Sequence, residues 1–535
     1  MPTPPVDVQR TTIDGVATLW SDLGGDFTGV LVIGAGARDL TPATAGLHHL
    51  VEHLVMSRVG PVRIEHNASS SPTTIVFWAT GTPDRVADFL NRVSSAAASL
   101  GDVTEAELAV NRATVVTEVG PAGLYAGRGP MSARWGAAGL GLADLGHAAL
   151  LGLTVEDVRE FAATWLVTGA ARLALSGPPP STLALQLPTG EPPRREAHPE
   201  PLPLPTPGIT YTESGELSLS FLVDIDPPIR AVVGEAMRET LLRRLRRDAG
   251  RVYSVEIVTF LVDGTRSSWT LLTDPATPAA ALDVLRTAVL TVRELGTAGP
   301  DPDVMEHVHE ALEADMSLHE SRKGWVLWVA EAEARGDVTP PPPWAQPVDR
   351  VGAEQVRDAV GSMLDSLLVT FPQHLVGDGD VFDALEKELD LTPRAPLPTY
   401  EGMSRREIMI DLAGGGVETG LGSALTSSRG TVHKGKFFGP ARGLEIWLGP
   451  RQVAFTSLGA KITVDDLVLV GEDDDGDVEL VTRSGAAVLV NPAYFRGATE
   501  PWRRFMSAVP PQIVRHKRGI NELAAHAAQD EQPPH

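Results

Sequence analysis

The sequence predicts an α+β protein with two related segments and a third, mostly β segment. Residues 1–177 and 208–373 each show strand patterns, then helix patterns, then a further strand. A proline-rich stretch at 178–207 separates them, and such a stretch forms an extended linker rather than a helix or an inner strand. Residues 374–520 differ, because their strand patterns are short and have a period of two. A chain of 535 residues should also hold about three domains.

The composition is that of a globular protein with an acidic balance. Hydrophobic residues make up 43% of the chain, which is ample for packed cores. The 69 acidic residues outnumber the 45 basic ones and give a formal charge of −24, which argues against nucleic acid and anionic membranes as partners. The chain has no cysteine, so a metal ion would have to be bound by histidine and carboxylate side chains.

The start of the chain, MPTPPVD, lacks the basic and apolar regions of a signal peptide. No apolar stretch in the sequence reaches the length of a membrane span. We therefore expect a cytoplasmic protein.

The first segment begins with strand patterns at 15–20 and 27–33 and continues into an apolar helix pattern at 46–56. Another strand pattern at 73–78 ends shortly before Pro83, which can begin a helix. The helix pattern at 46–56 is unusual, because histidine and glutamate side chains interrupt its apolar run.

The interrupting residues form the pattern H-x-x-E-H at 49–53, a zinc motif of metallopeptidases. His49 and His53 face the same way on a helix, so two imidazoles can bind one metal ion. Glu52 is close enough to take a proton from a water on that ion, whose pKa zinc lowers to about 7. The alternative is a helix with three buried polar side chains, which is costly unless they have partners.

A third ligand is expected on a second helix. Thr104 and Glu107 fit a capping box, so a helix should begin there. Glu107, Asn111 and Glu118 then lie on one face of that helix. Because a catalytic zinc normally has three protein ligands, a carboxylate from this face can complete the set. A solvated surface charge is the alternative for Glu118.

The second segment repeats the strand and helix patterns of the first. Strand patterns at 217–223 and 253–259 enclose a helix pattern, and four prolines at 340–343 mark a turn between later helical stretches. Five arginines lie between 243 and 251, where they indicate a basic helical face. Tyr253, taken alone, indicates a strand residue packed in the core.

The third segment should end in one closing helix. Its strand patterns lie at 444–448, 453–456 and 478–481. An acidic turn is expected at 473–477 and the closing helix at 499–509. Residues 521–535 are polar and are expected to form a disordered tail.

The H-x-x-E-H helix and the later glutamate resemble the M16 (insulinase, or pitrilysin-like) metallopeptidase family. The resemblance implies that His49, His53 and Glu118 bind Zn²⁺ and that Glu52 is the general base. The family often carries another glutamate seven residues before the third ligand. This chain has Asn111 there, which cannot supply a charge, although Glu107 could partly compensate.

Residues 245–254 resemble the second-domain pattern of the family, L-R-x-x-x-G-x-x-Y-S. The resemblance implies that Arg246 and Tyr253 approach the substrate at a zinc site, where a cation and a phenol can donate hydrogen bonds to an oxyanion. Asn67 and Ala68 resemble the active-site edge strand of the family. Such a strand would bind a peptide substrate through backbone hydrogen bonds, with little selectivity.

Members of the M16 family enclose their substrates in a chamber of two halves, each with two related α/β-sandwich domains. The resemblance covers about residues 10–373 and so supplies one half. It implies a homodimer, or a heterodimer with another M16-type chain, in which Arg246 and Tyr253 act on the facing subunit. Residues 374–520 weakly resemble a pleckstrin-homology-like domain but contain no basic cluster for phosphoinositides. A protein-contact or dimer-bracing role is therefore expected for them.

The predicted function is a zinc-dependent endopeptidase that cleaves peptides inside a dimeric chamber. Removal of a leader from a precursor peptide and general peptide degradation are both compatible with the sequence. The rival prediction is a non-catalytic M16-type subunit with a structural or binding role. Such members usually lose residues of H-x-x-E-H, and all of them are present here.

Overall fold

The computed structural model describes residues 6–519. The gaps in this range are 121, 128, 196, 213–216, 226, 264–265, 276, 337–347, 373–374, 376–378, 394–429, 438–439 and 456–459. The predicted tail at 521–535 lies outside the described residues, as does the expected turn at 340–343.

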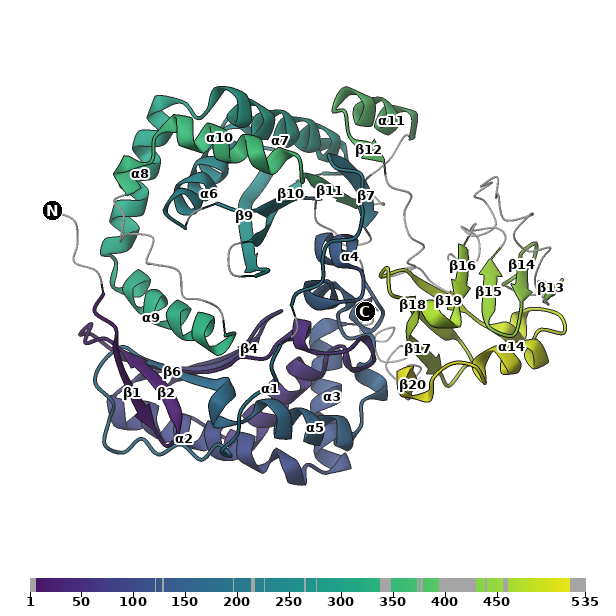
Figure 1. The fold of residues 1–535 in the computed structure, drawn as a ribbon, viewed down its shortest axis with the longest axis horizontal. Coiled ribbons are helices and arrows are strands. Elements are labelled where there is room, and N and C mark those ends of the chain that lie inside the picture. Colours follow the sequence, from purple (N-terminus) through teal and green to yellow (C-terminus); the bar gives the residue numbers. More distant parts are fainter. Residues whose placement is uncertain are drawn as a thin grey trace, which may run out of the picture.

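A six-stranded sheet with the order β1-β2-β6-β3-β5-β4 organises the first domain. Its strands are β1 (Gln9–Ile13), β2 (Val16–Trp20), β3 (Phe27–Ile33), β4 (Glu65–Ser70), β5 (Ile75–Gly81) and β6 (Ala171–Leu175). Its outer face is covered by α1 (Leu47–Val59) and α2 (Pro83–Ala98) (Figure 1). Two further helices, α3 (Glu105–Val119) and α5 (Val155–Trp165), pack against α1. Because β4 is an edge strand, one side of its backbone is not paired within this sheet.

The two helices that carry the motif residues form where the sequence predicts them. α1 follows Gly46, whose φ of +91° suits a glycine, and ends before Gly60. α3 begins with the expected capping box, in which the side chain of Thr104 accepts a hydrogen bond from the backbone N–H of Glu107. Their apolar faces, with Leu50, Val51 and Leu108, are buried in the same core.

The second domain repeats the first. Its sheet has the order β12-β7-β11-β8-β10-β9. The strands are β7 (Gly208–Thr212), β8 (Leu217–Val223), β9 (Val252–Leu261), β10 (Ser267–Pro275), β11 (Leu368–Pro372) and β12 (Thr392–Pro393). The expected boundary at residue 373 is therefore wrong, because β12 pairs with β7 in this sheet. The last five strands of this order correspond to β2-β6-β3-β5-β4, with the same parallel pair, so the predicted repeat is confirmed.

The helices of the second domain include α6 (Pro227–Leu242), α7 (Pro278–Ala298) and α10 (Ala353–Leu364), which contribute to its core. Two further helices, α8 (Pro302–Ser317) and α9 (His319–Ala334), return toward the first domain (Figure 1). α9 packs on the inner face of the first sheet, with Trp325, Val326 and Val329 against Val30 and Val32. A Cβ atom on Gly34 would lie 2.0 Å from the carbonyl oxygen of Ala334, so glycine allows this close approach.

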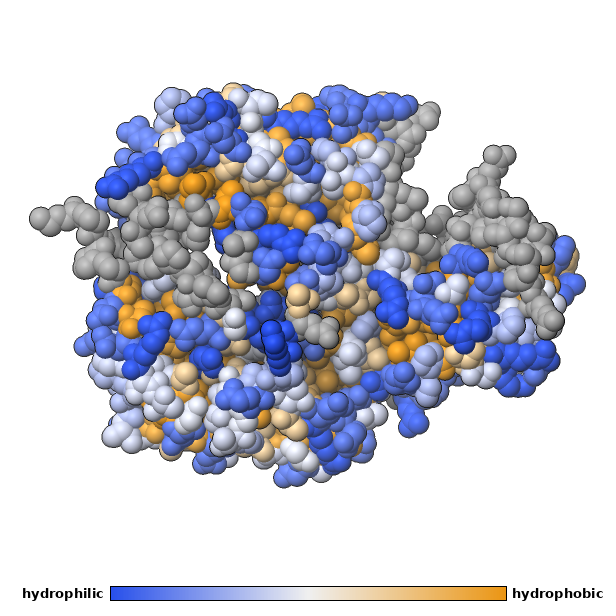
Figure 2. All heavy atoms as spheres, viewed as in Figure 1, coloured by the Kyte–Doolittle hydropathy of each residue, from blue (hydrophilic) through white to orange (hydrophobic). Residues whose placement is uncertain are grey.

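One buried arginine also joins the two domains. Arg134 lies in α4 (Pro130–Trp135) and is 2% exposed. Its guanidinium donates hydrogen bonds to Oγ and the carbonyl oxygen of Ser220 and to the carbonyl oxygen of Ser366. Burial lowers the pKa of Arg134 to about 9. In Figure 2, hydrophobic residues are visible between the two halves of the main body.

The proline-rich linker contains neither helix nor strand between residues 178 and 207, apart from residue 196, which is not described. It is not a free spacer, because Leu183, Leu185 and Leu187 are buried in the core of the first domain. These leucines alternate with the exposed residues Ala184 and Gln186, which gives the extended segment one buried side.

The C-terminal domain contains two four-stranded sheets. They are formed by β13 (Thr431–Lys434), β14 (Glu445–Leu448), β15 (Gln452–Phe455) and β16 (Ala460–Thr463), and by β17 (Leu467–Asp473), β18 (Val478–Thr482), β19 (Ala487–Val490) and β20 (Val514–Lys517). The expected closing helix, α14 (Thr499–Met506), does not close the domain. Pro510 and Pro511 prevent the helix from continuing, and β20 then pairs parallel with β17.

Within the described residues, none of the helices is both long enough and apolar enough to span a membrane.

Candidate metal centre

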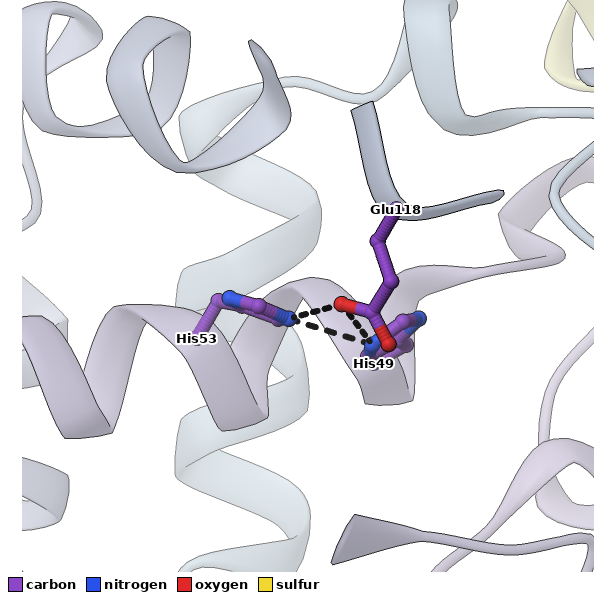
Figure 3. Close-up of side chains that lie close together, drawn as sticks. All are labelled: His49, His53 and Glu118. Carbon is purple, nitrogen blue, oxygen red and sulfur yellow. Dashed lines mark hydrogen bonds and ion pairs between the residues drawn. The ribbon is translucent and has the colours of Figure 1, made fainter. Parts of the chain in front are cut away.

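Three predicted ligand atoms lie together between α1 and the last turn of α3. Nε2 of His53 lies 3.1 Å from Nε2 of His49 and 3.1 Å from Oε2 of Glu118. The third edge of this triangle, from His49 Nε2 to Glu118 Oε2, is 3.5 Å. Figure 3 shows both imidazoles on one helix and the carboxylate reaching them from the other. The structure thus brings together the three side chains that the sequence predicted as ligands.

The size of the triangle fits a zinc ion. Four ligand atoms at about 2.0–2.2 Å from a tetrahedral zinc lie about 3.3–3.6 Å from one another. The three edges, between 3.1 and 3.5 Å, are close to that separation. Two imidazole nitrogens and one carboxylate oxygen also form a common donor set for catalytic zinc, with the fourth position left for water or substrate.

Glu52 lies beside the ligands on the same helix. Glu52 is 8% exposed. Together with His49 and Glu118, it lines a cavity of about 320 Å³. Burial raises the pKa of Glu52, while a hydrogen bond to the side chain of Ser70 and the charge of His53 act in the opposite direction. The carboxylate therefore binds a proton more readily than an exposed glutamate does.

His147 belongs to this site, although the sequence analysis missed it. Its Nε2 lies 2.9 Å from Nδ1 of His49. Burial, followed by the charge of His49, lowers the pKa of His147 to about 4, so the ring is neutral near pH 7. A neutral His147 can accept the Nδ1–H proton of His49, which leaves Nε2 of His49 as the metal-binding nitrogen.

The approach of His147 depends on a glycine before the motif. A Cβ atom on Gly46 would lie 2.9 Å from Cδ2 of His147, so a larger residue would push the ring away. The backbone N–H of His147 is held by the carbonyl oxygen of Gly123, in the loop after α3. Gly46, three residues before His49, is the local sign of this contact in the sequence.

Glu107 does not replace the charge that Asn111 lacks. Its carboxylate accepts hydrogen bonds from Nε and the terminal nitrogen of Arg58, at 2.9 and 3.0 Å. Asn111 is buried and donates to the backbone oxygen of Glu107 rather than to a ligand. The suggested compensation is therefore wrong, because Glu107 is neutralised about three turns away from Glu118.

Asn67 and Ala68 lie in β4, at the edge of the first sheet, as predicted for an edge strand. They face Trp78 and Phe77 of β5 in the antiparallel register. Asn67 is exposed, and Ala68 is buried and lines the cavity at the ligands.

Arg246 and Tyr253 lie together at the edge of the second sheet. The guanidinium of Arg246 lies 5.2 Å from the ring centre of Tyr253, which is 77% exposed. A core position for Tyr253 is therefore wrong. The other four arginines of this run are in ion pairs: Arg243 and Arg247 with Glu239, Arg244 with Glu294 and Arg251 with Asp283. Neither Arg246 nor Tyr253 lines the cavity at the zinc ligands of its own chain.

No protein-family model and no curated protein sequence matches this chain. Among solved structures, it is similar to a protease from Helicobacter pylori, with 14% identity and a TM-score of 0.53 over 68% of this chain and 99% of that chain. A peptidase M16 inactive domain from Pseudomonas fluorescens is similar with 14% identity and a TM-score of 0.52 over 68% of this chain and 98% of that chain. The periplasmic protease PqqL from Escherichia coli has 10% identity and a TM-score of 0.51 over 90% of this chain and 56% of that chain. The chain therefore has the two-domain α+β fold of M16 peptidases.

Proposed function

We propose that this protein is a zinc-dependent endopeptidase. The observation that carries the proposal is the ligand triangle, whose edges of 3.1 to 3.5 Å suit one zinc ion. The fold that this chain shares with the protease from Helicobacter pylori supports a peptidase role for such a centre. His49, His53 and Glu118 would hold the ion.

Bound zinc would supply a Lewis acid for the scissile carbonyl and lower the pKa of water. Glu52 would take a proton from the attacking water and later give it to the leaving amine. Its raised pKa supports both steps, because a stronger base accepts the proton more readily and still holds it for transfer.

β4 would hold the peptide substrate. Its unpaired edge offers backbone N–H and C=O groups to an extended chain. Ala68 lies at the cavity and Asn67 lies next to it on the same strand, so a peptide bound there would pass the zinc ligands.

Arg246 and Tyr253 would act from a second chain. Both can donate hydrogen bonds to an oxyanion, and both lie outside the zinc cavity of their own chain. That second chain would be another copy of this protein or another M16-type chain.

The substrate would be a peptide, and the net charge of −24 favours basic peptides. Removal of a leader would give one defined cut in a precursor, whereas general degradation would give many cuts. Mass spectrometry of the products distinguishes these two roles.

Replacement of Glu52 with Gln tests the proposal. Glu52→Gln should lower kcat for peptide hydrolysis by about 10²- to 10⁴-fold, because the amide cannot accept the proton. Zinc content, measured by mass spectrometry of the metal, should stay the same because Glu52 is not a ligand. Unchanged cleavage by Glu52→Gln contradicts the proposal. A zinc-loaded wild type that cleaves no peptide would favour the non-catalytic subunit.

A further inference from the structure

The two faces of the first sheet meet different surroundings at the edge strand. Ser69 pairs with Val76, which packs against α9, whereas Ser70 pairs with Ile75, which lies in the core below the helices. The side chain of Ser70 is hydrogen-bonded to Glu52. Alternate residues of β4 therefore face the zinc ligands on one side and α9 on the other.

A second cavity, of about 670 Å³, lies on the α9 side. Its walls come from both domains and combine polar side chains with a group of aromatic and aliphatic ones: Trp325 and Trp328 of α9, and Ile257, Phe260 and Trp269 of the second sheet. The rings of Trp325 and Trp328 are stacked, with centres 4.9 Å apart and an angle of 18° between them. Ser69 and Ser71 line both this cavity and the one at the zinc ligands.

We propose that this cavity binds large apolar side chains at alternate positions of the peptide substrate. The inference rests on the proposed function, because it needs a peptide that pairs with β4. Such a peptide continues the sheet, so its side chains point in turn toward the two faces. Those on the face of Ser70 meet Glu52, and those on the face of Ser69 enter the cavity.

The walls of the cavity select the chemistry of these side chains. Its volume suits one or two aromatic or long aliphatic groups. Arg230 and Arg335 also line it, against a single carboxylate from Glu331. Lysine and arginine side chains are therefore disfavoured at these positions, although the protein as a whole is acidic.

A library of synthetic peptides tests the proposal. Wild-type cleavage, followed by mass spectrometry, should favour Phe, Trp or Leu at two positions that are two residues apart. Trp328→Ala should lower kcat/KM for these peptides by about tenfold, and should leave peptides with Ala at both positions unchanged. Leu327→Ala is the control, because Leu327 lies in the same helix and does not line the cavity.

A second variant fills the cavity without removing a packed side chain. Gly324 lines it, and a Cβ atom there would meet nothing within 4 Å. Gly324→Phe should reduce the preference for aromatic side chains in the same way, whereas Gly324→Ala should keep it. A preference that is unchanged in both Trp328→Ala and Gly324→Phe overturns the inference.

Measurement of peptide binding without cleavage distinguishes failure of this inference from failure of the proposed function. The same peptides, labelled with a fluorophore, are titrated against the Glu52→Gln variant. If the wild type cleaves peptides but neither cleavage nor binding depends on Trp328, only the cavity inference fails. If the wild type cleaves nothing while binding of apolar peptides depends on Trp328, the peptidase fails and the cavity remains.

Discussion

His49 is held by a residue that lies far from it in the sequence. Its Nδ1 contacts His147, which follows the third ligand by 29 residues and is fixed through the carbonyl oxygen of Gly123. A metal-binding histidine commonly donates a hydrogen bond from its second ring N–H to a carboxylate, a backbone carbonyl or water. Here the acceptor is a neutral imidazole, so it orients His49 without adding negative charge to the centre.

Loss of His147 should weaken zinc binding. His147→Phe keeps an aromatic ring but removes the acceptor, so zinc affinity should fall by about 10- to 100-fold. The measurement is a competition titration with a zinc chelator. His309→Phe is the control, because His309 contacts the carbonyl oxygen of Val351 in the second domain and not the ligands. Equal affinities for His147→Phe and wild type would refute the role of His147.

The sequence predicts the ligand residues because their geometry is local. His49 and His53 lie one turn apart on a helix, and the capping box fixes where the helix of Glu118 begins. His147 could not be found in this way, since its contact with His49 is tertiary and carries no spacing signal. The ion pair of Glu107 with Arg58 is also tertiary, which explains why a compensating role for Glu107 looked reasonable in the sequence.

At the scale of elements, the C-terminal domain packs on the loop that follows α3. Lys517 of β20 is 2% exposed, and its Nζ lies 2.5 Å from Oε2 of Glu479 in β18. It also donates to the carbonyl oxygen of Leu124, and Glu479 accepts from the backbone N–H of Ala126. The buried pair thus connects the C-terminal sheet to the segment between Glu118 and His147.

Breaking this buried pair should destabilise the protein. Lys517→Met leaves the carboxylate of Glu479 buried without its cation, which should cost about 3 kcal/mol of unfolding free energy. Urea unfolding measures the loss, and hydrogen exchange should become faster at residues 122–126. Lys434→Met is the control, because the exposed pair of Lys434 with Glu445 contributes little. If both variants lose the same stability, the buried pair does not brace the loop.

Regular elements follow from the sequence more readily than their packing does. Sequence patterns place α1 and the strands β2, β3, β5, β8 and β9, because side chains in these elements face the core of their domain. The packing of α9 on the first sheet depends on Gly34 and on the path of the chain from the second domain back to the first. Periodicity cannot show that path. The parallel pairing of β20 with β17 was missed for the same reason, because its partner is set by tertiary structure.

At the scale of the whole molecule, the two sheets are repeats with equivalent edge strands. β4 of the first sheet passes the zinc ligands, and β9 of the second carries Tyr253 beside Arg246. In the proposed dimer, the β9 edge of one chain meets the zinc site of the other. A complete site then needs residues from two chains.

Complementation between two inactive variants tests this arrangement. In a homodimer, coexpressed Glu52→Gln and Tyr253→Phe chains form mixed dimers in which one site keeps both residues. Random pairing should then restore about a quarter of wild-type activity, because half of the dimers carry one intact site of two. Each variant alone should be far less active. Activity no higher than the average of the two variants would show that Tyr253 does not act across a homodimer.

The most direct measurement is anomalous diffraction at the zinc absorption edge from crystals of the purified, unchelated protein. The ligand triangle predicts one strong peak at about 2.0–2.2 Å from Nε2 of His49, Nε2 of His53 and a carboxylate oxygen of Glu118. The peak should disappear in His53→Ala crystals. A wild-type crystal with full zinc content but no peak at these three atoms would contradict the metal centre and, with it, the proposed peptidase.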